Sequence, residues 1–354
     1  MRPVIALFSA LCLLAGCRTP GNGPMEAPLD RLMQDYTGHA PGAAVLVVRD
    51  GVPVVRRGYG LADLEAATPV TPQTSFRLAS VSKQFTAAAV LLLAQDGRLT
   101  LDDPVRRWLP ALPPAAQPVT LRHLLTHASG VLDYEDFVAD DDPQVHDADV
   151  LRLLQAHDRL AFAPGSDYHY SNSGYALLAL VVEHASGQRY PEFLRQRIFA
   201  PLGMASVAHV EGRTTVPRRA FGHSLVQESG RWQRTDQSST SAVLGDGGIY
   251  ASIDDLAKWD AALFDARLLS DASRADAFTA HTPIRDETGV DGYGYGWRVH
   301  GSGDDLLLWH SGETMGFRNV ILRWPRQRLT VVVLTNRNDP EPYPLAQKIA
   351  ALYR

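Results

Sequence analysis

The sequence predicts an α+β fold in which both ends of the chain form one antiparallel sheet and the middle forms a mostly helical lobe. Strand-rich segments lie near the two ends, at about 40–75 and 290–354, and apolar helical segments lie between them, at about 85–240. This order of blocks is typical of α+β proteins. With 354 residues, of which 45% are hydrophobic and 21% charged, the chain can bury a large core. We assign residues 28–354 to this domain.

The strands at both ends are predicted from runs of apolar and β-branched residues around turn signals. "AAVLVVRDGVPVVRRGYG" places Asp50-Gly51 between two such runs, which is a strong hairpin signal. Near the other end, "VILRWPRQRLTVVVLTN" predicts a second strand-turn-strand unit, and "PEPYPLAQKIAALYR" has the apolar spacing of a closing helix.

The predicted helices of the lobe each end at a glycine. "SKQFTAAAVLLLAQDGRL" ends at Gly97 and is apolar on nearly every face, so we expect this helix to be buried. "LRHLLTHASG" and "YALLALVVEHASG" repeat the pattern. A shorter helix is predicted from "DRLMQDYTGHA", before the first strand.

The N-terminus has the layout of a bacterial secretion signal. "MRPVIALFSALCLLAGC" starts basic, continues with a short apolar run and ends in small residues. Leu14 to Cys17 resemble a lipobox, which implies a signal peptide over 1–17, a lipid on Cys17 and a flexible tether over 18–27; an ordinary signal peptide is the alternative. Arg18 after the cysteine favours the outer membrane. We therefore expect a periplasm-facing, lipid-anchored protein of the bacterial envelope, without a disulfide.

The charge of the chain argues against nucleic acid as a partner. Its formal net charge is -5, so no basic field is available to hold phosphates.

One lysine stands out in a chain that is rich in arginine. Lysine occurs only at Lys83, Lys258 and Lys348, whereas Lys and Arg together number 34. Lys83 follows Ser80 by three residues at the start of the apolar helix, and residues i and i+3 share a helix face. A desolvated lysine can lose its proton and act as a general base, which arginine cannot. A capping serine beside a surface lysine is the ordinary alternative.

Two further triplets supply residues that such a serine would need. Tyr170-Ser171-Asn172 and His310-Ser311-Gly312 are the only Tyr-x-Asn and His-x-Gly triplets in the chain. A tyrosine hydroxyl can pass protons to a leaving group, and an amide can orient the lysine and the substrate carbonyl. Each triplet is weak by itself, and their order after Ser-x-x-Lys makes the pattern specific.

With these motifs the chain resembles the superfamily of serine β-lactamases and penicillin-binding proteins, in the branch of class C β-lactamases, Streptomyces-type DD-carboxypeptidases and related esterases. "SFRLASVSKQFTA", "TLRHLLTHASGV", "YSNSGYALL", "GDGGIYASIDDLAKW" and "WHSGETMGF" carry the resemblance. It implies acylation of Ser80, activation by Lys83, proton relay by Tyr170, positioning by Asn172, and a role for His310, Ser311 and Gly312 beside the substrate. The resemblance also implies an oxyanion hole from the backbone N–H groups of Ser80 and Glu313, Gly247 near the cleft, and no cofactor.

The substrate is left open among a D-Ala-D-Ala peptide, an ester and a β-lactam. A DD-peptidase-like or esterase-like hydrolase is favoured, because class C β-lactamases typically carry lysine where this chain has His310. A class C-like β-lactamase and a non-catalytic lipoprotein that binds peptidoglycan or a β-lactam are the alternatives.

The sequence does not fit two other hydrolase classes. No Gly-x-Ser-x-Gly elbow is present, which an α/β-hydrolase would need. His123 and His127 lack the acid of a zinc motif, so no metal is expected.

Overall fold

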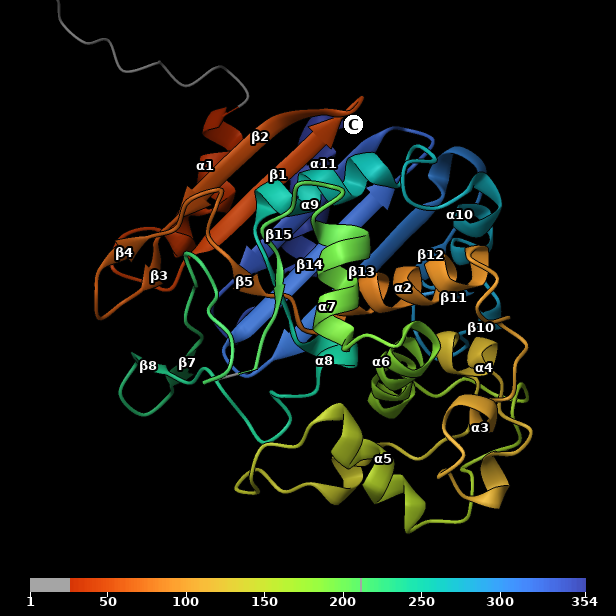
Figure 1. Cartoon of the computed structure of the whole chain (residues 1–354). Coiled ribbons are helices and arrows are strands. Elements are labelled where there is room, and N and C mark those ends of the chain that lie inside the picture. Colours follow the sequence, from red (N-terminus) through yellow and green to blue (C-terminus); the bar gives the residue numbers. More distant parts are fainter. Residues whose placement is uncertain (1–25, 211) are drawn as a thin grey trace, which may run out of the picture.

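The computed structural model describes residues 26–210 and 212–354. The expected signal peptide, Cys17 and nearly all of the expected tether lie outside the described residues. Figure 1 shows a large sheet built from red and blue strands, which come from the two ends of the chain, with a yellow and green helical lobe beside it. The fold class predicted from the sequence is confirmed.

The main sheet has eight antiparallel strands in the order β10-β11-β12-β13-β14-β15-β1-β2. Their bounds are β10 Thr282–Pro283, β11 Gly292–Tyr293, β12 Arg298–His300, β13 Leu307–Thr314, β14 Phe317–Trp324, β15 Leu329–Thr335, β1 Ala43–Arg49 and β2 Val52–Tyr59. The smaller pairings join β3 Leu61–Asp63 with β4 Thr68–Pro69, β7 His223–Val226 with β8 Arg231–Arg234, and β9 Ile249–Ala251 with both β5 Phe76–Arg77 and β6 Val207–Ala208.

The sheet joins the two ends of the chain at one pair of strands. β1 pairs with β15 from Ala43 opposite Thr335 to Arg49 opposite Leu329. The predicted hairpin connects β1 to β2, and both turn residues have positive φ, 53° at Asp50 and 80° at Gly51, as a type I′ turn requires. The N-terminal and C-terminal segments therefore fold as a single unit.

Side chains of the central strands alternate between two hydrophobic cores. On β1, Ala43, Val45 and Val47 pack in the core that includes α1 and α11, whereas Ala44 and Leu46 belong to the core shared with the helical lobe. Both faces of these strands are buried, which explains their continuous apolar sequence.

The helices cover both faces of the sheet and form the lobe. Their bounds are α1 Glu26–Leu32, α2 Lys83–Gln95, α3 Val105–Trp108, α4 Leu121–Leu125, α5 Asp147–Gln155, α6 Asn172–Ser186, α7 Tyr190–Leu194, α8 Leu244–Gly247, α9 Ile253–Ala262, α10 Asp271–Ala277 and α11 Tyr343–Tyr353. The single-turn segments are η1 Gln34–Tyr36, η2 Ala79–Ser82, η3 Pro114–Ala116, η4 Tyr134–Phe137, η5 Arg195–Phe199 and η6 Gly303–Asp305.

Helix α2 lies between the sheet and the lobe (Figure 1). Every residue from Lys83 to Leu93 is buried, as the all-apolar pattern predicted. The helix after Thr120 is shorter than predicted, because α4 ends at Leu125 and His127 has a φ of 55°. α6 ends with Gly187 in the left-handed region, as its sequence predicted.

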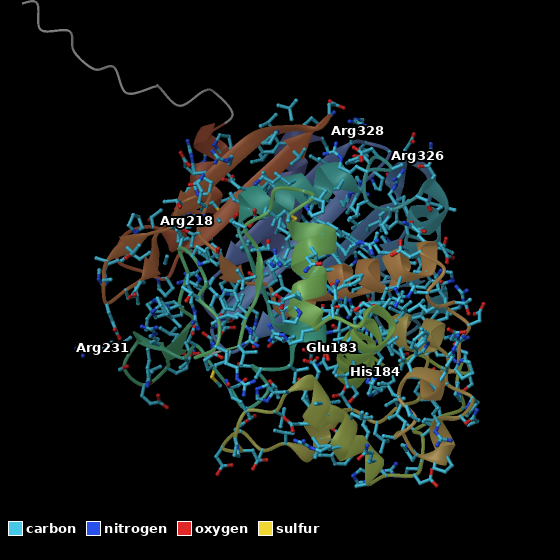
Figure 2. The ribbon with its side chains drawn as sticks, viewed as in Figure 1. Glu183, His184, Arg218, Arg231, Arg326 and Arg328 are labelled. Atoms are coloured by element: carbon cyan, nitrogen blue, oxygen red, sulfur yellow. The ribbon has the colours of Figure 1, made fainter. Side chains whose placement is uncertain are left out.

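Charged side chains lie over the surface on opposite sides of the molecule, with Arg218 and Arg231 on one side of the view and Arg326 and Arg328 on the other (Figure 2). Within 26–210 and 212–354, no helix has the length and apolar character that crossing a membrane requires.

Candidate active site

The serine and lysine of the first motif meet at the entry to α2. Ser80 lies in the single turn η2, and Lys83 is the first residue of α2, so the nucleophile candidate precedes the α-helix rather than standing in its first turn. The Lys83 Nζ atom lies 3.1 Å from Ser80 Oγ. Ala79, just before the serine, has a φ of 49°, an uncommon conformation for a residue with a side chain. Ser80 is thus presented on a sharp, strained turn.

Lys83 is fully buried and makes three hydrogen bonds. Besides the bond to Ser80, Nζ donates to Asn172 Oδ1 at 2.7 Å and to the Asp246 backbone carbonyl at 3.0 Å. Neither the amide oxygen nor the carbonyl can donate, whereas the serine hydroxyl can either donate or accept. Nζ therefore donates to the side-chain oxygen of Asn172 and the backbone oxygen of Asp246, and Ser80 Oγ is its third hydrogen-bond neighbour.

The start of α6 positions the asparagine. Ser171 caps the helix, with its Oγ accepting from the Gly174 N–H at 3.3 Å. The Asn172 N–H donates to Asp133 Oδ2 at 2.6 Å. This anchoring leaves the Asn172 side chain directed at Lys83.

Tyr170 and His310 lie close to this group, away from the open pocket. Lys83 Nζ is 4.9 Å from the centre of the Tyr170 ring, and the Tyr170 hydroxyl is buried without a hydrogen-bond partner among the described residues. The His310 ring is buried and centred 6.1 Å from that of Tyr170. The structure therefore places the Tyr170 ring beside the lysine, and its hydroxyl makes no hydrogen bond to Nζ.

The tautomer of His310 follows from its two hydrogen bonds. Nδ1 lies 2.6 Å from the Ser311 carbonyl, which can only accept, so Nδ1 carries the proton and Nε2 accepts from the Tyr293 hydroxyl at 2.8 Å. Burial, together with the cations Arg298 and Lys83, lowers the pKa of His310 well below its usual value. His310 is thus neutral at pH 7.

Strand β13 passes close to the serine turn, and glycine permits this approach. A Cβ atom on Gly312 would lie 2.1 Å from the Leu78 carbonyl oxygen. Thr314 and Phe317 form the hydrogen-bonded pair that closes a two-residue turn. Hydrogen-bonded and non-hydrogen-bonded pairs alternate along antiparallel strands, so the next pair, Glu313 with Arg318, is not hydrogen-bonded. The Glu313 N–H therefore points away from β14, toward η2. The Ser80 N–H lies at the start of a helical turn, so no carbonyl of a preceding turn accepts it. The N–H groups of Glu313 and Ser80 are therefore available to an oxyanion.

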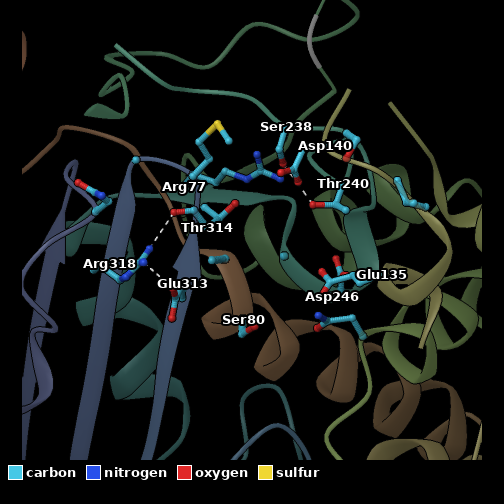
Figure 3. Close-up of a pocket in the computed structure, with 18 of the residues that line it drawn as sticks. Arg77, Ser80, Glu135, Asp140, Ser238, Thr240, Asp246, Glu313, Thr314 and Arg318 are labelled. Carbon is cyan, nitrogen blue, oxygen red and sulfur yellow. Dashed lines mark hydrogen bonds and ion pairs between the residues drawn. The ribbon is translucent and has the colours of Figure 1, made fainter. Parts of the chain in front are cut away.

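A pocket of about 590 Å³ opens in front of Ser80 (Figure 3). Its lining comes from Arg77, Ala79, Ser80, Tyr134, Glu135, Val138, Asp140, Asn172, Ser224, Ser238, Ser239, Thr240, Asp246, Gly247, Glu313, Thr314, Met315, Gly316, Arg318 and Asn338. Of the residues selected from the sequence, Ser80, Asn172, Gly247 and Glu313 line the pocket. The others do not line it, namely Lys83, Tyr170, His310, Ser311 and Gly312.

The family model described as Beta-lactamase matches residues 29–353. The chain belongs to this family. It is a serine hydrolase of the β-lactamase and penicillin-binding protein type, as the resemblance implied.

Relatives of this Beta-lactamase family member include penicillin-binding proteins and amide hydrolases. The chain is 32% identical to penicillin-binding protein 4* of Bacillus subtilis (strain 168), over 86% of its own length and 70% of the relative's. It is 30% identical to a D-aminopeptidase of Gluconobacter oxydans (strain 621H), over 92% of its length but only 61% of the relative's. The D-amino acid amidase from Ochrobactrum anthropi SV3, solved with L-phenylalanine amide, is similar in structure, with a TM-score of 0.81, 25% identity and coverage of 94% and 99% of the two chains.

Two carboxylates of this family member line the pocket and were not singled out from the sequence, Glu135 and Asp246. Burial is the main cause that raises the pKa of Asp246, to about 7, and Lys83 opposes it. Burial and the neighbouring Asp133 raise the pKa of Glu135, with an opposing hydrogen bond from Asn172. The Tyr134 hydroxyl donates to Asp246 Oδ2 at 2.9 Å. Asp246 falls within the "GDGG" stretch, which the sequence already placed near the cleft. Glu135 falls within "LDYEDF", which follows a helix end and has the sequence of an ordinary loop.

The other candidate residues from the sequence, two histidines and three aromatic residues, have contacts typical of structural residues. His123 Nδ1 accepts the Thr120 N–H at the start of α4, and His127 Nδ1 accepts the Ser171 N–H at 3.0 Å. Within 26–210 and 212–354, no three His, Cys, Asp or Glu side chains form a group suited to a metal ion. The aromatic residues of "DGYGYGWRV" are candidates from the sequence either for a substrate wall or for core packing, and the structure buries Tyr293, Tyr295 and Trp297 in the core.

Proposed function

We propose that the protein hydrolyses small amides, peptides or esters through an acyl-enzyme on Ser80. The observation that carries this proposal is the distance of 3.1 Å between Ser80 Oγ, on a residue that lines the pocket, and the fully buried Lys83 Nζ. Only a deprotonated lysine can accept the serine proton, and in that form Nζ can still donate to Asn172 Oδ1 and the Asp246 carbonyl.

The reaction then proceeds in two stages. Ser80 Oγ attacks the substrate carbonyl while its proton passes to Lys83, and the N–H groups of Ser80 and Glu313 stabilise the oxyanion. The leaving group departs with a proton, for which Tyr170 is the proposed relay, and Ser80 holds the acyl group. Water then attacks the acyl carbon, and the acid product leaves as Ser80 regains its proton. Asn172 holds Lys83 in place during both stages.

Support for an amide or peptide substrate comes from the relatives, which include a D-aminopeptidase and a D-amino acid amidase. Class C β-lactamases typically carry lysine where this chain has His310, and His310 is neutral, so this position supplies no cation to a β-lactam carboxylate. We therefore place the DD-peptidase-like and esterase-like readings ahead of a class C-like β-lactamase.

Intact-protein mass spectrometry tests the acyl-enzyme. The purified protein is mixed with p-nitrophenyl acetate, and separately with benzylpenicillin, over a time course, with Ser80→Ala as the control. We expect an acyl adduct or ester turnover that depends on Ser80. A lasting penicillin adduct would favour a DD-peptidase, and rapid loss of penicillin would favour a β-lactamase. Equal behaviour of wild type and Ser80→Ala in every arm contradicts the proposal.

We also propose that the protein is anchored to the bacterial envelope through a lipid on Cys17, facing the periplasm. The lipobox-like Leu14-Ala15-Gly16-Cys17 supports this proposal. Cys17→Ser should move the protein from the membrane fraction to the soluble fraction and abolish labelling with radioactive palmitate. Unchanged fractionation and labelling in the variant contradict the anchor.

A further inference from the structure

We propose that Asp147, the first residue of α5, is a positioning residue for the reaction at Ser80, because its carboxylate holds the short helix α8, whose Asp246 carbonyl orients Lys83. The inference rests on the proposed function, since it names a residue that acts through the proposed base. Asp147 does not line the Ser80 pocket, so its effect on the reaction passes through other residues.

The carboxylate of Asp147 accepts two successive backbone N–H groups at the start of α8. Oδ2 accepts from Leu244 at 3.0 Å, and Oδ1 accepts from Gly245 at 2.9 Å. The first N–H groups of a helix have no acceptor within the helix, so the carboxylate supplies one to each of these two. A backbone bridge between His146 and Ala242 joins the same two segments. The starts of α5 and α8 are therefore tied together, although they lie far apart in the chain.

The negative charge of Asp147 is explained by this contact. The residue is buried, and its printed partners within 26–210 and 212–354 are backbone N–H groups rather than a cation. Burial raises the pKa of Asp147 to about 6, and the N–H groups of Gly245 and Leu244 oppose this rise. At neutral pH the carboxylate is thus largely ionised, and its desolvation is costly unless hydrogen bonds compensate it. An asparagine would avoid this cost, but its single amide oxygen cannot replace both carboxylate oxygens.

Helix α8 carries one of the acceptors that orient the base. The Asp246 carbonyl, next along the chain from Gly245, accepts from Lys83 Nζ at 3.0 Å. The Gly245 carbonyl accepts from Thr86 Oγ1 at 2.6 Å, and Thr86 lies three residues after Lys83 on α2. Residues three apart share a helix face, so α8 contacts one face of α2 at two points. Since only Asn172 provides Nζ with another pure acceptor among its printed hydrogen bonds, a displaced α8 would redirect the amine.

Asp147→Asn tests the positioning through the separation of the chemical step from substrate binding. Stopped-flow kinetics with p-nitrophenyl acetate should show an acylation rate constant lowered by about tenfold and a substrate Kd within about twofold of the wild type, because a misdirected base slows the chemistry without changing the pocket lining. Asp255→Asn is the matched control, since Asp255 in α9 is also buried, accepts the Ala205 N–H at 2.9 Å and does not line the pocket. An Asp147→Asn protein that acylates at the rate of Asp255→Asn would overturn the inference.

A double-mutant cycle shows whether the effect passes through the lysine. In a Lys83→Ala background, Asp147→Asn should lower the remaining acylation of Ser80 by less than about twofold, because the Asp246 carbonyl then has no amine to orient. Intact-protein mass spectrometry measures both rates. An effect of the same size in both backgrounds would contradict the inference, since it would indicate a general loss of structure.

A second variant loosens α8 from the other side. Thr86→Val removes the donor to the Gly245 carbonyl and leaves Asp147 unchanged, so acylation should fall by at least about threefold. Tyr190→Phe is its control, because the Tyr190 hydroxyl bonds to Thr86 Oγ1 at 2.5 Å and its loss leaves the bond to Gly245 in place. Equal acylation rates in these two variants would show that the base does not depend on the position of α8, which also rejects the inference.

Amide hydrogen exchange separates this inference from the proposed function. In Asp147→Asn, the N–H groups of Leu244 and Gly245 should exchange at least about tenfold faster than in the wild type, and those of α9 should be unchanged. Unchanged exchange in α8, with normal acylation of wild-type Ser80, sinks the inference and leaves the hydrolase intact. Faster exchange without any acylation of wild-type Ser80 would sustain the hold of Asp147 on α8 and reject the proposed chemistry.

Discussion

Lys83 Nζ and Asn172 Oδ1 lie 2.7 Å apart although 89 positions separate the two residues in the chain. One opens helix α2 and the other opens helix α6, so the N-termini of two buried helices meet beside Ser80. The catalytic proposal depends on this meeting, because the asparagine fixes the direction in which the buried amine points.

Asn172→Ala should lower kcat for ester or amide hydrolysis by about 10²-fold, since Lys83 loses an acceptor that orients it. Asn338→Ala is the matched control, because Asn338 lines the same pocket without a hydrogen bond to Lys83. Steady-state kinetics on p-nitrophenyl acetate distinguish the two variants. Similar kcat values for both would contradict the assigned role.

Lys83→Arg should lower acylation of Ser80 by about 10²- to 10⁴-fold, because a guanidinium does not release its proton at workable pH. Lys258→Arg, a change at a partly exposed lysine of α9, serves as the control for the substitution itself. The acylation rate is followed by mass spectrometry, and thermal unfolding checks that the variant folds. A folded Lys83→Arg protein with the wild-type rate would exclude lysine as the base.

The free energy of unfolding should depend on pH through Asp246. Its folded pKa of about 7 lies above the usual value of 3.8, so the folded state binds more protons between these values. Stability then falls as pH rises from about 4 to 7, by roughly 2–4 kcal/mol from this group. Asp147, with a pKa raised to about 6 by burial, acts in the same direction. Urea unfolding at several pH values should show a shallower decline in Asp246→Asn; an unchanged slope contradicts the assignment.

Gly312→Ala should destabilise the fold by more than about 2 kcal/mol and reduce activity, because its Cβ would lie 2.1 Å from a backbone oxygen of Leu78. Gly247→Ala is the matched comparison, since its Cβ would lie 3.5 Å from Ala79 Cα, an ordinary contact. Thermal and urea unfolding of the two variants measure the difference. Equal stability would show that β13 and η2 can separate at little cost.

His310→Lys should raise reactivity toward substrates that carry a carboxylate, because it puts a cation in place of a neutral imidazole. The reaction with benzylpenicillin, followed by mass spectrometry, is the measurement. Unchanged kinetics in a folded variant would count against a role of His310 beside the substrate.

The sequence alone determined the fold class and indicated which residues are candidates for the centre of the site. The apolar, β-branched runs on both sides of Asp50-Gly51 specify a hairpin through local turn geometry. A helix that is apolar on nearly every face must be buried wherever it packs. The pair Ser80 and Lys83 could be matched from their spacing, since three residues along one helical path bring side chains together.

Only the tertiary structure decided what surrounds this pair. Glu135 lies in η4 and Asp246 in α8, which are far apart in the chain, and their local sequences do not show that the two carboxylates lie together on one pocket wall. Conversely, Tyr293 was a candidate for that wall and is buried against His310. Side-chain identity and local spacing predict contacts within one element, whereas a pocket is assembled from elements whose approach depends on packing over the whole domain.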